Sequence, residues 1–302
     1  MDSPPIVIIH CLAYNQASFI KKCLDGFVMQ KTNFPFHAVV HDDASTDGTA
    51  DIIREYAEKY PDIIQPILET ENLWRKGNGL LSKVMDEACK DAKYLAYCEG
   101  DDYWTDPLKL QKQVDFMEAN PDYSICYHDV AILDNATGEF DYSNAINNGI
   151  PEESSIIELA DHNYIHTPSV MYRYSPIVTE KLQKMGASIV KDYARNLFYA
   201  ELGKIKRLPE SMAVYRYGVG VWTGNPTMDS KRPVFWLIAL SKLIPLIDDN
   251  DIRNMMEMKL GELRNFIFTD HENALAEIER LKATNAYKLG KLLLKPLAWI
   301  QR

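Results

Sequence analysis

Residues 94–102 read YLAYCEGDD, and this stretch decides the fold that the chain is expected to adopt. Its first five residues form a short apolar run, which is typical of a strand buried on both faces of a sheet. The run leads directly to Asp101 and Asp102. Two adjacent carboxylates are costly to bury unless they are paired or bind a metal, so the stretch predicts a core strand that ends in a polar site. A solvated turn is the alternative.

Strand and helix patterns alternate on both sides of this stretch. Such alternation predicts an α/β fold with a doubly wound, mostly parallel sheet. A proline within the third apolar run places that strand at an edge of the sheet. The apolar runs that predict strands cover residues 6–11, 38–41, 63–68, 94–98 and 123–133, and helical spacing covers 17–30, 49–60 and about 80–92, with a further helix near 106–117.

Polar residues follow three of the predicted strands. Ligands of doubly wound sheets bind at the carboxyl ends of strands, which directs attention to segments 14–15, 42–49 and 99–102. Tyr14 can stack on a base, and an acid such as Asp43 can accept hydrogen bonds from a base or a ribose. Segment 42–49 can equally be a turn that caps the next helix. A phosphatase motif is disfavoured there, because a serine stands where the nucleophilic aspartate would be.

The composition argues against several classes of protein. The chain has 302 residues and a formal net charge of −10, whereas nucleic-acid binding requires clustered lysine and arginine. Its five cysteines are scattered without a CxxC pair, which predicts buried thiols in a reducing cytosol. The N-terminal residues lack the basic region of a signal peptide. The longest apolar stretch, residues 234–247, is too short and too interrupted to span a membrane.

The second half of the chain has a different pattern. A loop-rich segment is followed by shorter strands, a helix near 191–203 and, after Gly224, a long helical region. We therefore expect one main domain and a C-terminal helical extension. The expected divisions are 1–133 for the first half of the main domain, 134–224 for its second half, 1–224 for the whole of it, and 225–302 for the extension.

Three short motifs occur in order along the first half: AYN at 13–15, DDASTDGT at 42–49 and EGDDYWTDPLKLQKQ at 99–113. In order and spacing they resemble the family 2 glycosyltransferases with the GT-A fold, over about residues 5–130 and more weakly to about 222. The resemblance implies a Rossmann-like sheet, a nucleotide-sugar donor and a divalent metal, Mn²⁺ or Mg²⁺. UDP is the nucleotide that it favours, with dTDP next.

The resemblance also implies roles for individual residues in these motifs. Tyr14 matches a base-stacking position, and Asp43 matches a position that contacts the base. Asp102 matches the acid that holds the metal, and Asp101 matches the acid that contacts the ribose or sugar of the donor. Trp104 would shape the sugar and acceptor pocket, or would serve only as a packing anchor.

Two strings in the second half resemble catalytic segments of the family. The string VKDY at 190–193 is similar to its base motif and makes Asp192 the candidate general base; a helix N-cap is the alternative role. The string YRYG at 215–218 is similar to a segment that commonly ends in histidine, but Gly218 stands there. A usual metal ligand is therefore missing, and its replacement is left open. Arg216 either faces the donor diphosphate or forms a structural ion pair.

The C-terminal residues differ from the rest in charge. Residues 281–302 contain five basic residues and no acidic one, so the remainder of the chain carries −15. The predicted helix 285–295 has lysines along one side and leucines along another, and Trp299 follows it. Basic amphipathic helices of this kind bind anionic membrane surfaces; a helix packed on the domain is the alternative. We expect a cytoplasmic protein that contacts the inner face of the cell membrane through this tail.

Together these features predict an inverting glycosyltransferase that moves a sugar from a nucleotide diphosphate sugar, most simply a UDP-sugar, to a hydroxyl. The expected acceptor is a glycan or lipid-linked acceptor in surface polysaccharide synthesis. A nucleotidyltransferase on a related fold is one alternative, but it requires a Gly- and basic-rich loop where LAYNQ stands at 12–16. A non-catalytic sugar-nucleotide or glycan-binding module is the other, and the retained Asp101 and Asp102 argue against it.

Overall fold

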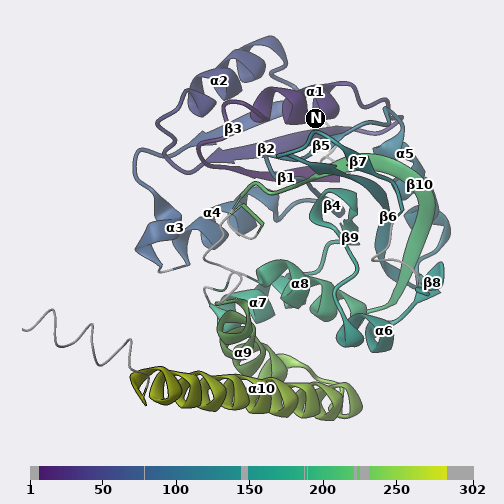
Figure 1. Ribbon diagram of the computed structural model, residues 1–302. Helices are drawn as coiled ribbons and strands as arrows, with labels where there is room; N and C mark the ends of the chain where they lie inside the picture. Colours follow the sequence, from purple (N-terminus) through teal and green to yellow (C-terminus); the bar gives the residue numbers. More distant parts are fainter. Residues whose placement is uncertain are drawn as a thin grey trace, which may run out of the picture.

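The computed structural model describes residues 7–77, 79–143, 149–186, 188, 190–220, 223–224 and 231–283. Within these ranges one sheet runs through the whole domain in the order β3-β2-β1-β4-β9-β6-β10-β5, with β7 beside β6 and β8 beside β10 (Figure 1). The strands are β1 Val7–Ala13, β2 Phe36–Asp42, β3 Ile64–Leu68, β4 Tyr94–Tyr97, β5 Tyr103–Trp104, β6 Tyr123–Asp134, β7 Phe140–Asp141, β8 Glu153–Ser154, β9 Met171–Arg173 and β10 Lys204–Tyr217.

Helices cover both faces of this sheet. They are α1 Ile20–Val28, α2 Thr49–Lys59, α3 Leu73–Lys76, α4 Leu80–Cys89, α5 Lys109–Ala119, α6 Ile156–Asp161, α7 Pro176–Met185, α8 Lys191–Ala200, α9 Arg232–Leu243 and α10 Asn250–Ala283. Strands β1 to β4 pair in parallel, and β6 pairs in parallel with β10. The short strand β9 joins the two sets by antiparallel pairing with β4 and β6. The predicted α/β fold and the edge position of the proline-containing strand β3 are confirmed.

Two apolar cores lie on opposite faces of the sheet, because successive side chains of each buried strand point to opposite sides. In β1, Val7 and Ile9 pack with residues of α1, α2 and α5, including Phe27. Ile8, which lies between them, packs with residues of α4, α7 and α8, including Leu197. Burial on both faces explains why the predicted strands read as continuous apolar runs. The five cysteines are free and buried, as expected.

The second half is more regular than its sequence suggests. The region expected to hold shorter strands contains β10, which is 14 residues long, and the additional helix α7. Pro209 lies within β10, whose pairing with β6 has register irregularities between Leu208 and Ala213. The guanidinium of Arg207 pairs with both carboxylate oxygens of Asp129 at 2.7 Å and ties β10 to β6 across this irregular stretch.

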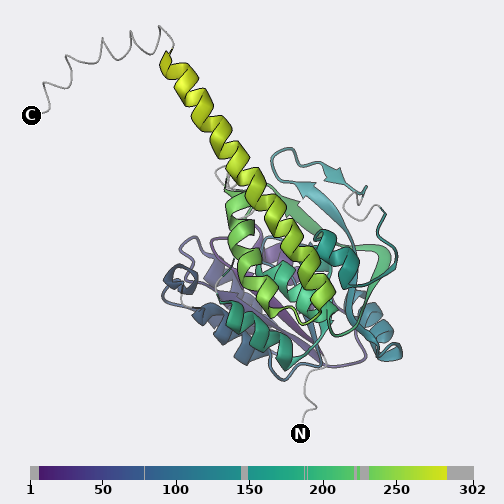
Figure 2. The same ribbon diagram turned by 90° about the horizontal axis from the view of Figure 1, so that it is seen from below.

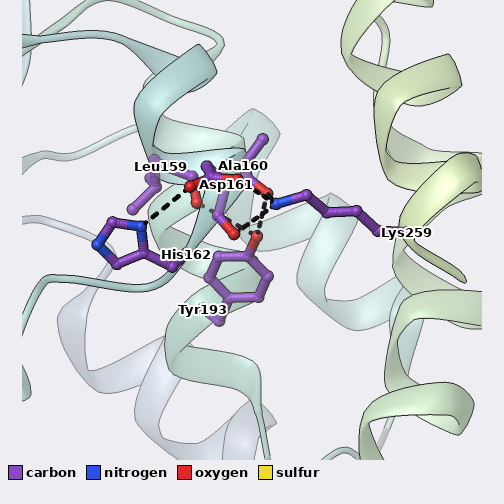
Figure 3. A network of polar contacts seen from close by, with 6 residues as sticks. All are labelled: Leu159, Ala160, Asp161, His162, Tyr193 and Lys259. Carbon is purple, nitrogen blue, oxygen red and sulfur yellow. Dashed lines mark hydrogen bonds and ion pairs between the residues drawn. The ribbon is translucent and has the colours of Figure 1, made fainter. Parts of the chain in front are cut away.

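Apolar residues of α9 and α10 pack into the core on one face of the sheet. One lysine of α10 adds polar contacts to the domain (Figure 3). The Lys259 ammonium on α10 donates to the Ala160 carbonyl at 3.2 Å and to the Asp161 carboxylate at 2.7 Å, at the end of α6. A cation in this position is favourable, because unpaired carbonyls make the C-terminus of a helix negative. The Tyr193 hydroxyl of α8 donates to the Leu159 and Ala160 carbonyls. One helix end therefore connects α8 and α10.

Beyond this attachment α10 extends away from the domain (Figure 2). The predicted helical character of the extension is confirmed for α9 and α10. The basic tail at 285–302 lies outside the described residues. None of the helices in the described ranges combines the length and apolarity that a membrane crossing requires.

The packing of α1 on β5 predicts that Gly26 tolerates no side chain. A Cβ at this position would lie 2.9 Å from the backbone nitrogen of Trp104, where only a shift of the helix or strand relieves the contact. We expect Gly26→Ala to lower the free energy of unfolding by about 1–3 kcal/mol in chemical denaturation.

Gly261 of α10 provides the matched control, because a Cβ there meets open space. Gly261→Ala should stabilise by up to about 1 kcal/mol, since alanine favours helix more than glycine does. Equal effects of the two substitutions would contradict the close approach at Gly26.

Candidate functional site

The three polar segments that follow β1, β2 and β4 lie together at the carboxyl edge of the parallel strands, as predicted. The Asp43 amide donates to the Ala13 carbonyl at 3.0 Å, and the Gly100 amide donates to the Leu12 carbonyl at 2.9 Å. A Cβ at Gly100 would collide with the Gln16 side chain. The glycine therefore lets the acidic segment 99–102 pack tightly against the end of β1.

Side chains of the DDASTDGT segment connect its loop to the loop after β1. The Asn15 amide donates to the Ser45 hydroxyl at 2.8 Å, and the Ala17 amide donates to the Asp47 carboxylate at 2.9 Å. Asn15 and Ala44 both have positive φ, at 51° and 61°, a backbone region that is strained for alanine. Ser45 and Asp47 therefore have structural roles in shaping these loops.

Asp43 is buried, and its carboxylate binds the start of α3. It accepts hydrogen bonds from the Leu73 amide at 2.6 Å and the Trp74 amide at 3.1 Å. Helix α3 carries the Arg75 guanidinium to within 6.0 Å of the centre of the exposed Tyr14 ring. The predicted base-stacking and base-contacting residues are therefore joined by α3, a connection that the sequence did not reveal.

Asp101 and Asp102 lie side by side at the centre of the site. Asp102 is only 4% exposed, and one of its carboxylate oxygens accepts a hydrogen bond from the Arg216 amide at 2.8 Å. Desolvation, followed by the charge of Asp101, raises the pKa of Asp102 well above its usual value. Desolvation also raises the pKa of Asp101, although the Arg216 guanidinium opposes this shift.

Asp192 on α8 belongs to the same electrostatic cluster. Desolvation raises the pKa of Glu99 to about 8, and the charges of Asp101 and Asp192 act in the same direction. By surface area, Glu99 is an exposed residue. Burial likewise raises the pKa of Asp192. We call Glu99, Asp101, Asp102 and Asp192 the acidic cluster.

A divalent cation fits this cluster in one specific way. Among the described residues no group of three or more His, Cys, Asp or Glu side chains is arranged to hold a metal. Gly218, at the position of the expected histidine, has a positive φ of 82° and offers no side-chain ligand. The crowded Asp101 and Asp102 instead suit a cation that takes one or two protein carboxylates and completes its shell with substrate phosphates and water.

Two arginines face the acidic cluster from different elements. The Arg216 guanidinium at the end of β10 lies 4.9 Å from the centre of the Phe19 ring and 5.1 Å from that of Tyr103. Arg195 lies one turn after Asp192 on α8, with its guanidinium 4.3 Å from the centre of the Tyr97 ring. Its charge lowers the pKa values of both Glu99 and Asp192, against the effect of burial. Sequence reasoning missed Arg195, although its i, i+3 spacing from Asp192 was a signal.

Trp104 occupies the packing position that the sequence left open. Its indole is 2% exposed, its ring contacts the Phe27 ring edge to face at 5.0 Å, and its N–H donates to the Pro168 carbonyl at 2.8 Å. The ring thus anchors the segment that follows Asp102. Its predicted part in shaping the sugar pocket stays a prediction.

The chain belongs to glycosyl transferase family 2, whose profile matches residues 8–177. An uncharacterized protein of Mycobacterium bovis is 38% identical over 228 residues, which cover 74% of this chain and 62% of that protein. A Bacillus subtilis protein is 31% identical over 114 residues, 37% of this chain and 42% of that protein; its name provisionally assigns it to teichuronic acid biosynthesis as a glycosyltransferase. The chain thus spans about three fifths of the length of the Mycobacterium relative.

Solved structures share the fold at low sequence identity. A mannosyltransferase of Pyrobaculum calidifontis, in complex with GDP-mannose and Mn²⁺, matches with a TM-score of 0.58 at 20% identity over 98% of this chain and 83% of its own. Staphylococcus aureus TarS in complex with UDP-GlcNAc matches with a TM-score of 0.57 at 17% identity, over 89% of this chain and 73% of its own. These likenesses confirm the predicted GT-A fold.

The contact between Asp43 and α3 predicts a local effect of removing this carboxylate. We expect Asp43→Ala to lower the free energy of unfolding by about 1–2 kcal/mol, because two backbone amides at a helix start lose their acceptor. Hydrogen exchange of the Leu73 and Trp74 amides should become faster than in the unmodified chain.

Asp51, which forms an exposed ion pair with Arg54 on α2, provides the control. Asp51→Ala should change stability by less than about 0.5 kcal/mol and leave exchange in α3 unchanged. Unaltered exchange at α3 in Asp43→Ala would show that this carboxylate does not hold the helix.

Proposed function

We propose that the protein is an inverting glycosyltransferase that moves a sugar from a nucleotide diphosphate sugar to an acceptor hydroxyl. The observation that carries this proposal is the acidic cluster, in which Asp192 from the second half of the domain joins the acidic segment after β4. Membership of glycosyl transferase family 2 supports it, as do the nucleotide sugars bound by two proteins of similar fold. In this proposal residues 1–133 bind the donor, 134–224 the acceptor, and 225–302 form the extension.

The donor side uses the residues at the carboxyl edge of β1, β2 and β4. Tyr14 stacks on the base, supported by the Arg75 guanidinium beside its ring. Asp43 contacts the base through carboxylate lone pairs that its two amide donors leave available. Asp101 contacts the ribose or the sugar. The donor is a UDP-sugar on the resemblance, and UDP-GlcNAc bound to TarS supports this nucleotide.

Asp102 holds the divalent cation together with the donor phosphates. The Mn²⁺ in the mannosyltransferase complex supports a metal of this type. When bound, the cation supplies Lewis-acid stabilisation of negative charge on the diphosphate. The Arg216 backbone fixes one oxygen of Asp102, and the Arg216 guanidinium beside Asp101 is available to the same diphosphate. The cation and the Arg216 guanidinium together would offset the repulsion between the negative charges of Asp101 and Asp102.

Asp192 acts as the general base. It removes the proton of the acceptor hydroxyl while that oxygen attacks the anomeric carbon from the face opposite the leaving diphosphate, which inverts the configuration. Burial raises the pKa of Asp192 and increases its basicity, and Arg195 keeps the shift moderate. A hydroxyl of a glycan or lipid-linked acceptor is supported by the name of the Bacillus relative.

This division of roles predicts different defects for two acid-to-amide variants. Titration with a panel of nucleotide sugars and Mn²⁺ should raise the melting temperature of the unmodified chain with at least one donor. Asp102→Asn should lose the metal-dependent part of this stabilisation. Asp192→Asn should keep it, but release of nucleotide diphosphate during slow donor hydrolysis should fall by about 10²–10⁴-fold, because water also needs the base.

Asp251→Asn is the control. Asp251 lies in the first turn of α10, as Asp192 lies in the first turn of α8, but Asp251 is exposed. It should match the unmodified chain in both measurements. Absence of stabilisation by every donor would exclude the transferase, and full hydrolysis by Asp192→Asn would remove Asp192 from the base role.

We also propose that the basic tail binds an anionic membrane surface at the inner face of the cell membrane. Its lysines Lys288, Lys291 and Lys295 should contribute about 1 kcal/mol each to binding of phosphatidylglycerol vesicles. Replacing all three by glutamine should therefore weaken sedimentation with these vesicles and leave the weak binding to phosphatidylcholine vesicles unchanged. If the variant binds phosphatidylglycerol vesicles as strongly as the unmodified chain does, the tail packs on the domain instead.

A further inference from the structure

A small apolar cluster lies apart from the two large cores of the domain. It consists of Tyr103 on β5, Val214 on β10, and Ala131 and Leu133 on β6. Tyr103 is in register with Val214, and Val214 with Ala131, so their side chains share one face of the sheet. The next registered row on this face contains Arg216, Leu133 and Phe140 of β7. This end of the sheet therefore presents an aromatic and apolar face with one arginine.

An open cavity of about 500 Å³ lies over this face. It is lined by Tyr103 and Val214 of the sheet and by residues of α1 and of the β7 segment. On the β7 side, Phe140 and Tyr142 are 44% and 64% exposed, and their rings stack at 5.8 Å with an angle of 20°. Two exposed rings held nearly parallel beside a cavity offer a flat apolar surface on which a ligand can stack.

Charged groups stand on the opposite side of the cavity. Lys22 and Asp25 of α1 are both exposed and line it. The Lys22 ammonium lies 4.0 Å from the centre of the Tyr103 ring, and the Asp25 carboxylate accepts a hydrogen bond from the Tyr56 hydroxyl. The cavity thus combines flat apolar rings with a hydrogen-bond donor and an acceptor, the mixture that gives a small-molecule site its orientation and specificity.

We infer that this cavity binds the sugar units of a glycan chain. A pyranose has C–H bonds on its faces and hydroxyls around its edge, so a ring such as Phe140 or Tyr142 can stack on the face while Asp25 and Lys22 bind the hydroxyls. An acyl or prenyl chain suits the site less well, because it would remove water from both charged groups without replacing their hydrogen bonds.

The position of the cavity suggests which glycan it holds. Tyr103 directly follows Asp102, and its ring contacts Lys22 on the cavity side and Arg216, which in turn lies beside Asp101. The cavity therefore adjoins the acidic cluster without containing any of its carboxylates. This assignment rests on the proposed function: the cavity holds sugar units of the acceptor that are remote from the reacting hydroxyl.

Binding of defined oligosaccharides to the full chain tests the inference. Saturation-transfer NMR with cello-, manno-, malto- and chito-oligosaccharides should detect binding of at least one series. Phe140→Ala and Tyr142→Ala should each weaken it by about tenfold or more, as when an aromatic anchor is truncated. Phe268→Ala, at an exposed aromatic of α10, is the matched control and should leave it unchanged. The affinity for nucleotide sugars should stay within about twofold in all three variants.

Four outcomes overturn the inference: no oligosaccharide binds, binding survives both substitutions, UDP displaces the oligosaccharide, or the substitutions reduce binding to phosphatidylglycerol vesicles instead. Its failure can be distinguished from failure of the proposed function. Donor stabilisation without oligosaccharide binding removes only the cavity assignment, and oligosaccharide binding without donor stabilisation removes only the transferase.

Discussion

Repulsion among carboxylates is the constraint on which the site depends. Glu99, Asp101, Asp102 and Asp192 are held together although burial raises the pKa of each, and the charges of neighbouring acids raise the pKa values of Glu99 and Asp102 further. Like charges in a desolvated site are unfavourable unless cations or hydrogen-bond donors compensate them. The surrounding structure provides this compensation from separate parts of the chain. The Arg216 amide and guanidinium come from β10, and the Arg195 charge comes from α8. The first half of the domain supplies most of the acids, and the second half supplies the groups that make their proximity tolerable.

This dependence explains the topology of the sheet. The antiparallel strand β9 joins β4 to the β6–β10 pair, which brings the end of β10 beside the acidic segment that follows β4. The pairing of Arg207 with Asp129 keeps β10 on β6 where its register is irregular. Without this connection Asp102 would lose the backbone donor that fixes one of its oxygens. The two halves therefore form one electrostatic unit even though their sequence patterns differ.

The sequence was sufficient to predict strands β1 to β4 and β6, their burial on both faces, and the meeting of Tyr14, Asp43 and the acidic segment, because buried parallel strands leave local patterns. It was insufficient where the structure depends on distant partners. Helix α3 is four residues long and leaves no periodic pattern, so the contact of its first amides with Asp43 was not foreseen. The length of β10 was not foreseen either, because its irregular stretch around Pro209 is continued by pairing with β6 on both sides. The i, i+3 spacing places Arg195 near Asp192 on α8, but spacing alone does not show that Glu99 also feels its charge.

The attachment of α10 sets a length scale for the molecule. A helix of 34 residues is about 50 Å long, which exceeds the radius of the domain from which it emerges. Lys259 and apolar residues of its first third hold it to the domain, and the rest of the helix extends away from the domain (Figure 2). In the proposed membrane-bound form of the protein, this helix would act as a spacer that sets the distance between the acidic cluster and the membrane surface. That distance would in turn decide which acceptor chains are long enough to reach the site.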